Sequence, residues 1–300
     1  MIIVKLMGGL GNQMFQYAAG RRLAHHHNTV LKLDLSFLGS VEESITPRRY
    51  ELEHLNIMAE IATPEEIAEL TGKGSTYLQS FLQQTRQALG LLLPVKNVIT
   101  EKHFHFDLAI LTAPNNTFLD GYWQSEKYFA DISDVIRQEF NVTSDPDDWN
   151  RRLAEEIKGC ESIAIHVRRC DYVSNAVTNA YHGTCPLDYY HAAIGMIVSQ
   201  VAEPHFFVFS DDSEWVRDNL QIHYLTTYLN HNGPYQGHED LRLMSLCRHH
   251  IIANSSFSWW GAWLARNPGN IVIAPDKWFT KADIDTRDLL PERWSRIARD

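Results

Sequence analysis

The second half of this chain alternates short apolar segments with longer amphipathic ones, and this alternation constrains the fold more than any other feature. The apolar segments that predict strands cover residues 161–169, 205–210, 251–254 and 271–275. Segments with helical spacing of apolar residues cover 186–201, 213–220, 238–250 and 256–266. Strands that alternate with helices form a parallel sheet with helices on both faces. We therefore expect a doubly wound α/β fold.

The beginning of the chain follows the same pattern around a glycine-rich turn. Ile2–Leu6 and Thr29–Leu35 predict strands, and the residues from Gln13 to His27 have helical spacing. This β-α-β order is typical of a Rossmann-like domain. The turn Gly8–Gln13 lacks the third glycine of a dinucleotide fingerprint, so it matches that motif weakly. It is not a P-loop either, since no Gly-Lys-Ser/Thr follows it.

The length of the chain predicts two domains, because 300 residues are about twice a usual domain length of roughly 150. Asp, Ser and Pro gather in Asn141–Asn150, which we predict to be the linker. The domains are then expected at residues 1–148 and 149–300. Within the first, Thr63, Pro64 and Glu66 predict a capped helix start.

Polar residues directly follow the predicted strands, at the edge where parallel sheets bind ligands. Arg168 and Arg169 follow one strand, and a guanidinium group holds phosphate oxygens without losing its charge. If the strand continues through them, they point to opposite sides and at most one faces a ligand. Asp171 would position that arginine or a substrate hydroxyl. The alternative is an arginine–aspartate pair on the surface.

Asn254–Ser258 joins another strand end to a helix through small polar residues. These residues offer helix caps and free backbone N–H groups, which together make an anion site at a helix N-terminus. They could equally cap only their own helix. Trp259, Trp260 and Trp263 come next, and we expect them to pack in the core rather than to bind sugars.

Asp211 and Asp212 follow the strand at 205–210. They are adjacent, whereas many metal-dependent sugar transferases carry D-x-D, and neighbouring side chains do not easily chelate one ion. We expect these carboxylates either to cap the next helix or to hydrogen-bond a ribose or a base, and metal binding is the less favoured interpretation.

The charge and the cysteines narrow the possible partners and the compartment. A formal net charge of -10 argues against a general nucleic-acid binder, so an anionic ligand needs a local basic site. Four cysteines without CxxC spacing indicate free thiols rather than zinc or disulfides. No apolar stretch approaches the roughly 20 residues of a membrane span. Because Asn254 begins a glycosylation sequon inside the expected site, we expect a cytoplasmic protein.

Five segments of the chain occur in an order and spacing that is typical of one family. They are KLMGGLGNQMFQYAAGRRLA, GYWQSEKYF, HVRRCDY, FSDD and ANSSFSWWGAWLA. With them, the chain resembles the bacterial α-1,2-fucosyltransferases of glycosyltransferase family 11 over about residues 1–275. The H-x-R-R-x-D core is shared with α-1,6- and protein O-fucosyltransferases. It therefore indicates GDP-fucose more strongly than it indicates the linkage.

The resemblance implies a GT-B-type α/β architecture, with two Rossmann-like domains facing each other across a cleft. Residues 1–148 would form the acceptor-side domain and 149–300 the GDP-sugar-binding domain. The implied reaction moves L-fucose from GDP-β-L-fucose to the 2-hydroxyl of a terminal galactose in an oligosaccharide, with inversion and without metal or cofactor. A lipid-linked acceptor would bring the enzyme to the membrane periphery. The alternatives are another linkage, another GDP-sugar, or a carbohydrate-binding protein, although such a protein needs no diphosphate site.

The resemblance also implies roles for single residues. Arg168 would hold the donor diphosphate, with His166 and Asp171 shaping its loop and Asn12 facing the cleft from the first domain. The general base is left open between Asp171, Glu126 and the histidines near the motifs. The residues expected around the donor are Arg168, Arg169, Ser210, Asp211, Asp212, Asn254, Ser255, Ser256, Phe257 and Ser258.

Overall fold

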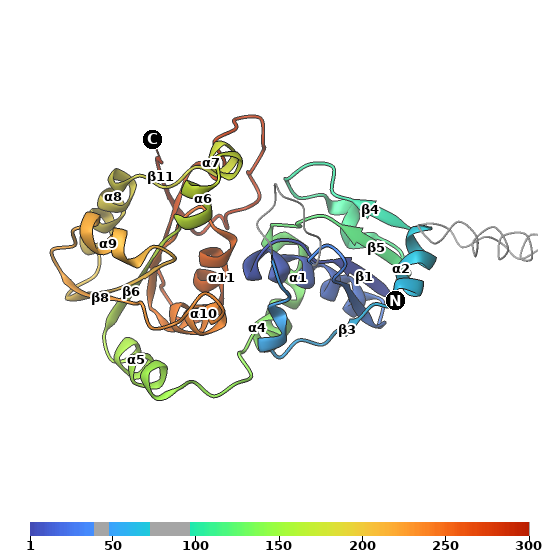
Figure 1. The fold of residues 1–300 in the computed structure, drawn as a ribbon, viewed down its shortest axis with the longest axis horizontal. Helices are drawn as coiled ribbons and strands as arrows, with labels where there is room; N and C mark the ends of the chain where they lie inside the picture. Colours follow the sequence, from blue (N-terminus) through green and yellow to red (C-terminus); the bar gives the residue numbers. More distant parts are fainter. Residues whose placement is uncertain (39–47, 73–96, 300) are drawn as a thin grey trace, which may run out of the picture.

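The structure is a computed structural model that describes residues 1–38, 48–72 and 97–299, with the backbone but not the side chain of Asp171. Its strands form two sheets that lie side by side, with helices α1 (Leu10–His26) and α11 (Ser256–Leu264) between them (Figure 1). Every pair of neighbouring strands in the described residues is parallel. The expected α/β fold with two parallel-sheet domains is confirmed.

The N-terminal sheet has the strand order β3-β2-β1-β5-β4. The predicted helix start is confirmed, because the Thr63 hydroxyl accepts from the Glu66 backbone N–H and the Glu66 carboxylate accepts from that of Thr63. Short 3-10 helices lie at Leu52–His54, Leu108–Thr112, Glu126–Tyr128 and Ala130–Ile132. The other elements of this half are β1 Ile2–Lys5, β2 Leu31–Asp34, β3 Glu60–Ile61, α2 Pro64–Thr71, β4 Val98–Thr100, β5 Thr117–Asp120 and α4 Ser133–Glu139.

The C-terminal sheet has the strand order β11-β10-β9-β6-β7-β8. Its strands are β6 Glu161–Val167, β7 Pro204–Ser210, β8 Leu225–Tyr228, β9 His249–Ile251, β10 Val272–Pro275 and β11 Ser295–Ile297. Its helices, besides α11, are α5 Asp148–Lys158, α6 Cys170–Ser174, α7 Ala176–His182, α8 Leu187–Val198, α9 Ser213–Asn219 and α10 Gly237–Leu246. The loops after β6, β7 and β9 leave this sheet at its carboxyl edge, beside one another.

Predicted elements of the C-terminal half differ in extent from the observed ones. The helix expected over 238–250 ends at Leu246, because Cys247 is extended and fully buried. The strand expected over 251–254 instead covers His249–Ile251, so the serine turn begins earlier than predicted. The strand expected over 161–169 ends at Val167, so Arg168 and Arg169 lie in the loop that follows. The strand at 272–275 is also not the last one, since β11 pairs with it.

The predicted linker is only partly a loop. Helix α5 begins at Asp148, inside the expected linker, because the Asp147 carboxylate accepts from the Asn150 backbone N–H at 2.7 Å and caps the helix. The two sheets are formed by residues 2–120 and 161–297. The boundary between residues 148 and 149 stays a prediction.

One apolar core connects the two halves through α1 and α11. The Phe15 ring lies 4.5 Å from the Trp259 ring and 4.8 Å from the Trp260 ring, centroid to centroid. The Trp260 indole N–H donates to the Gly11 carbonyl at 3.0 Å. Trp259, Trp260 and Trp263 are all buried, so the expectation that they pack as core is confirmed.

The two helices meet so closely that Gly11 has no room for a side chain. A Cβ atom at this position would lie 2.5 Å from the backbone nitrogen of Phe257, closer than packed atoms approach. We expect Gly11→Ala to lower the free energy of unfolding by about 1–3 kcal/mol or more, because the backbone of α11 must shift. Chemical denaturation measures this change.

Gly195→Ala is the matched control. Gly195 lies inside α8, and nothing lies within 4 Å of its added Cβ, so this variant should be unchanged or more stable by up to about 1 kcal/mol. Equal denaturation midpoints for both variants would contradict the close approach of the two helices.

Candidate active site

The candidate site is built where the strand ends of both sheets meet. Strands β6 and β9 are neighbours, so Arg168 and the turn that begins at Asn254 leave the same edge side by side. The end of β1 leads into α1, whose first turn contacts the first turn of α11 at Gly11 and Phe257. The predicted strand-end residues from the two halves of the chain are therefore brought together.

Asp211 fixes the loop that carries Arg168. One Asp211 carboxylate oxygen accepts from the Arg169 backbone N–H at 2.8 Å, and the other accepts from that of Cys170 at 3.2 Å. The Arg168 guanidinium forms an ion pair with the same carboxylate at 3.1 Å, and both side chains are about four-fifths buried. The guanidinium carbon lies 5.6 Å from the Tyr172 ring centroid. Arg168 is thus held in place before any ligand arrives.

Arg169 belongs to a second arrangement on the other side of the loop. Its Nε lies 3.2 Å from the Asp212 carboxylate, and its guanidinium carbon lies 3.4 Å from the Trp215 ring centroid. Asp212 also accepts from the Trp215 backbone N–H at 3.4 Å and caps α9, while its own N–H donates to the Ser210 hydroxyl. The two arginines therefore face different partners. The predicted contacts of Ser210, Asp211 and Asp212 with a donor stay predictions, because all three bond within the chain.

His166 is a buried neutral group beneath the site. Burial and the nearby positive charge of Arg168 lower the pKa of its imidazole to about 3. Its ring centroid lies 5.5 Å from that of Phe257, and its Nδ1 has no hydrogen-bond partner within the described residues. An imidazole with so low a pKa is a weak base, so His166 is placed to shape the site rather than to take a proton.

Asn12 connects the two domains at the site. Its side-chain oxygen accepts from the Gln124 amide at 2.8 Å and from the Ser256 hydroxyl at 2.6 Å. Gly8 (φ +74°) gives Asn12 room, since a Cβ at Gly8 would lie 2.3 Å from the Asn12 side-chain nitrogen. Asn12 therefore contacts the serine turn of the C-terminal domain, and its predicted place facing a cleft stays a prediction.

Asn254 is fully buried and bonds only inward among the described residues. Its amide nitrogen lies 3.0–3.1 Å from the carbonyl oxygens of His182, Gly183 and Trp278, and its oxygen accepts from the Cys185 thiol. These bonds hold the end of α7 and the loop after β10 against the turn. The Asn254 side chain therefore positions the site, and its predicted contact with a donor has no further support in this geometry.

The N-termini of α1 and α11 face each other but differ in what caps them. The carboxylate of Glu51 accepts from the Leu10 backbone N–H at 2.7 Å, so a negative charge already occupies the start of α1. Ser255 precedes α11 and makes no side-chain hydrogen bond to its backbone, while the Ser258 hydroxyl bonds back to the Ser255 carbonyl. The first N–H groups of a helix have no acceptor inside it. The start of α11 is therefore the better anion site of the two.

Two of the residues predicted as general-base candidates are Glu126 and Asp171. Glu126 accepts from the Trp263 indole N–H at 2.9 Å and pairs with Arg293 at 2.8 Å, near the far end of α11 and away from the serine turn. It is not brought into the site. The side chain of Asp171 lies outside the described residues.

Sequence reasoning missed Glu101 and Gln124. The Glu101 carboxylate accepts from the backbone N–H groups of Tyr122 and Trp123 at 2.8 and 3.0 Å, and burial raises its pKa. It holds a turn in which Trp123 has φ +56°, and the following residue, Gln124, bonds Asn12. The segment GYWQSEKYF carried the signal, but nothing in the sequence pairs it with a glutamate 20 residues earlier.

No helix among the described residues is both long enough and apolar enough to cross a membrane.

Comparison with known proteins gives the family. The family model of glycosyl transferase family 11 matches residues 1–297. An α-1,2-colitosyltransferase of Escherichia coli is 32% identical over 302 residues, which cover 99% of each chain. The O-antigen biosynthesis glycosyltransferase WbnK of Escherichia coli is 33% identical over 285 residues, covering 91% of this chain and 93% of that one.

A solved structure has a fold similar to that of this chain. The α-1,6-fucosyltransferase NodZ from Bradyrhizobium, in a crystal soaked with GDP-fucose, aligns with a TM-score of 0.53 at 14% identity, covering 91% of this chain and 94% of that one. The two parallel-sheet domains thus form a GT-B-like fold. Because the family model spans nearly the whole chain, the chain belongs to glycosyltransferase family 11.

Proposed function

We propose that this chain is a galactoside α-1,2-fucosyltransferase, which moves L-fucose from GDP-β-L-fucose to the 2-hydroxyl of a terminal galactose in an oligosaccharide. The observation that carries the proposal is the pairing of Arg168 with Asp211 beside the uncapped start of α11. A fixed guanidinium and a helix N-terminus suit a departing diphosphate. The five motifs support the linkage, and so does the α-1,2 linkage in the name of the 32% identical relative.

The reaction is a displacement at the anomeric carbon. The acceptor oxygen forms a bond to that carbon from the face opposite GDP, and the bond to the diphosphate oxygen breaks with its electron pair. Arg168 and the N–H groups of Ser256 and Phe257 offset the charge that builds on the diphosphate. The hydroxyl proton leaves to a base that we do not assign. Glu126 is set aside because its carboxylate bonds Trp263 and Arg293.

We propose that the reaction needs no metal. The Asp211 carboxylate accepts two backbone N–H groups and pairs with Arg168, while that of Asp212 pairs with Arg169 and caps α9. The two carboxylates therefore bind different arginines of the loop after β6, and neither is left free of protein partners. In this proposal the positive charge that a metal would bring to the diphosphate comes from Arg168.

The α-1,2-colitosyltransferase relative makes GDP-colitose a second candidate donor. Colitose is fucose without the 3-hydroxyl group, so a site that accepts one sugar discriminates against the other through that single group. We propose GDP-fucose as the donor because the motif set resembles the fucosyltransferases. The acceptor is an oligosaccharide, and a lipid-linked one would hold this enzyme, which we place in the cytoplasm, at the membrane surface.

The first test measures release of GDP from GDP-fucose in the presence of lactose and other galactosides. We expect release that depends on the acceptor, is faster than with GDP-colitose, and continues in the presence of EDTA. Faster turnover of GDP-colitose would change the donor and keep the reaction class. No acceptor-dependent release from either donor, over several galactosides, would remove the proposal.

The second test concerns the diphosphate group. Arg168→Ala should lower kcat by about 100-fold or more, which is typical of losing one preorganised electrostatic group. Arg168→Lys keeps the positive charge but lacks the planar guanidinium group, so its kcat should lie between those of wild type and Arg168→Ala. Arg152→Gln, on the exposed face of α5, is the control and should match wild type. Activity of Arg168→Ala within threefold of wild type would show that this residue is not at the diphosphate.

The third test separates two roles for Asp211. If Asp211 acts by holding Arg168, then Asp211→Ala should lower kcat by about tenfold or more alone and by less than about threefold in the Arg168→Ala background. If Asp211 instead contacts the nucleotide directly, the fold-losses in kcat of the two single variants should multiply in the double variant. Single-variant and double-variant rates under saturating substrates complete the cycle.

A further inference from the structure

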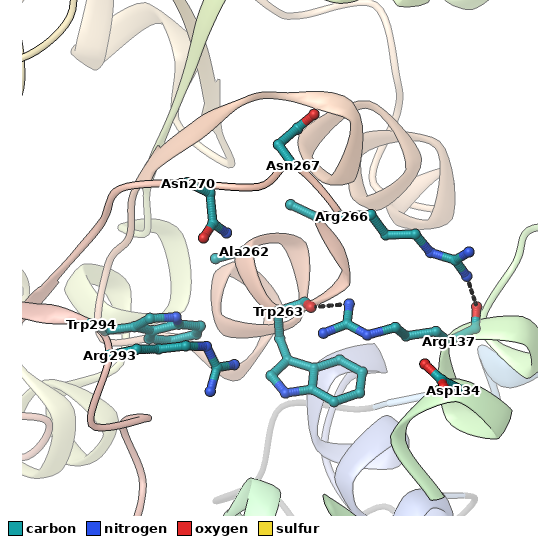
Figure 2. A pocket seen from close by; sticks show the side chains of 10 residues that line it. Asp134, Arg137, Ala262, Trp263, Arg266, Asn267, Asn270, Arg293 and Trp294 are labelled. Atoms are coloured by element: carbon teal, nitrogen blue, oxygen red, sulfur yellow. Dashed lines mark hydrogen bonds between the residues drawn. The ribbon is translucent and has the colours of Figure 1, made fainter.

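A polar cavity of about 360 Å³ lies at the carboxyl end of α11, the opposite end from the candidate active site (Figure 2). Arginines from three separate segments line it: Arg137 from α4, Arg266 after α11, and Arg293 before β11. Asn267 and Asn270 line the same cavity, and the Asn267 amide nitrogen donates to the Cys247 carbonyl at 3.0 Å. The proposed reaction uses none of these residues.

Two of the three arginines form no ion pair within the described residues. Neither Arg137 nor Arg266 has a carboxylate oxygen within 4.0 Å of its guanidinium group, although the Asp134 side chain lines the same cavity. Arg137 donates to the Trp263 carbonyl and stacks 3.9 Å from the centre of its ring, and Arg266 donates to the Arg137 carbonyl at 3.4 Å. Only Arg293 is paired, with Glu126 at 2.8 Å.

The local charge is positive on a protein that is otherwise acidic. Three guanidinium groups face two nearby carboxylates, those of Glu126 and Asp134, while the whole chain has a net charge of -10. Burial and the positive charges of Arg266 and Arg293 lower the pKa of Arg137, so the cluster disfavours its own charges. An anion in the cavity would relieve that repulsion.

We propose that this cavity is a binding site for a phosphate-type oxyanion, separate from the active site. Guanidinium groups match phosphate oxygens in geometry and charge, and the Asn270 amide adds a donor. Figure 2 shows the guanidinium groups of Arg137 and Arg293 on either side of the Trp263 indole, with Asn270 across the cavity. The volume equals that of about twelve water molecules at ~30 Å³ each, enough for a phosphate or a diphosphate.

The test measures binding of pyrophosphate by calorimetry, with GDP present at saturation to fill the active site. We expect one site per chain in the wild type. Arg266→Gln should weaken it by about tenfold or more, the effect of losing one charge-assisted hydrogen bond. Arg266 is exposed and makes no ion pair among the described residues, so this variant should fold. Arg152→Gln is the matched control on α5 and should bind as wild type.

A second arm separates the two sources of such an anion. Wild type and Arg266→Gln are sedimented with vesicles of phosphatidylglycerol and, as control, of phosphatidylcholine. Binding of wild type to phosphatidylglycerol alone, lost in the variant, supports a lipid headgroup, and binding of pyrophosphate alone supports a free phosphate compound. Equal binding by variant and wild type in both arms overturns the proposal, as does binding of neither ligand.

Discussion

The packing of α11 between the two sheets is the constraint on which the rest of the structure depends. Its indole N–H groups donate to three partners outside the helix: Leu289, Gly11 and Glu126. Gly11 and Glu126 belong to the N-terminal half, which also supplies Arg137 at the end of α11. A helix held by both halves along its length cannot turn or slide. Its N-terminus is therefore fixed against the loop of Arg168 without any contribution from a substrate.

This arrangement favours catalysis by preorganised charge. Asp211 orders the loop of Arg168, and Asn12 bonds the serine turn. Glu51 accepts from the first N–H group of α1, so of the two helices that meet here α11 has the more open N-terminus. Positive groups that are already in place need no rearrangement when charge develops on a leaving group. Separating the domains widely would expose tryptophans that each contribute about 1.5–3 kcal/mol or more through burial, so large opening is costly.

The elements of the fold were largely predictable from the sequence, because their signals are local. The alternation after residue 161, the β-α-β opening and the capping box at Thr63 each depend on neighbouring residues. The helix end at Leu246 was missed, because only tertiary packing makes Cys247 extended and buried. Strand β11 was missed because it is short and pairs with β10 through a contact between distant segments.

The candidate site was predictable in its location but not in its internal bonding. Strand ends of a parallel sheet meet at one edge, so Arg168, Asp211 and Asn254 had to be close. Which carboxylate holds which arginine depends on loop geometry, and the sequence left that open. Asn254 bonds three backbone carbonyls, a role that no spacing indicates. Glu101 lies 20 residues before the turn it holds, so nothing linked the two.

The contact between Gly11 and Phe257 has a consequence for how such proteins diversify. Each of these two helices is part of the core of the other domain, so the N-terminal domain is not an independent module. A chimaera that takes residues 1–148 from one relative and the remainder from another would pair α1 and α11 of different proteins. Their contact surfaces did not evolve together. New acceptor preferences are therefore more accessible through changes in the surface loops of one chain than through exchange of whole domains.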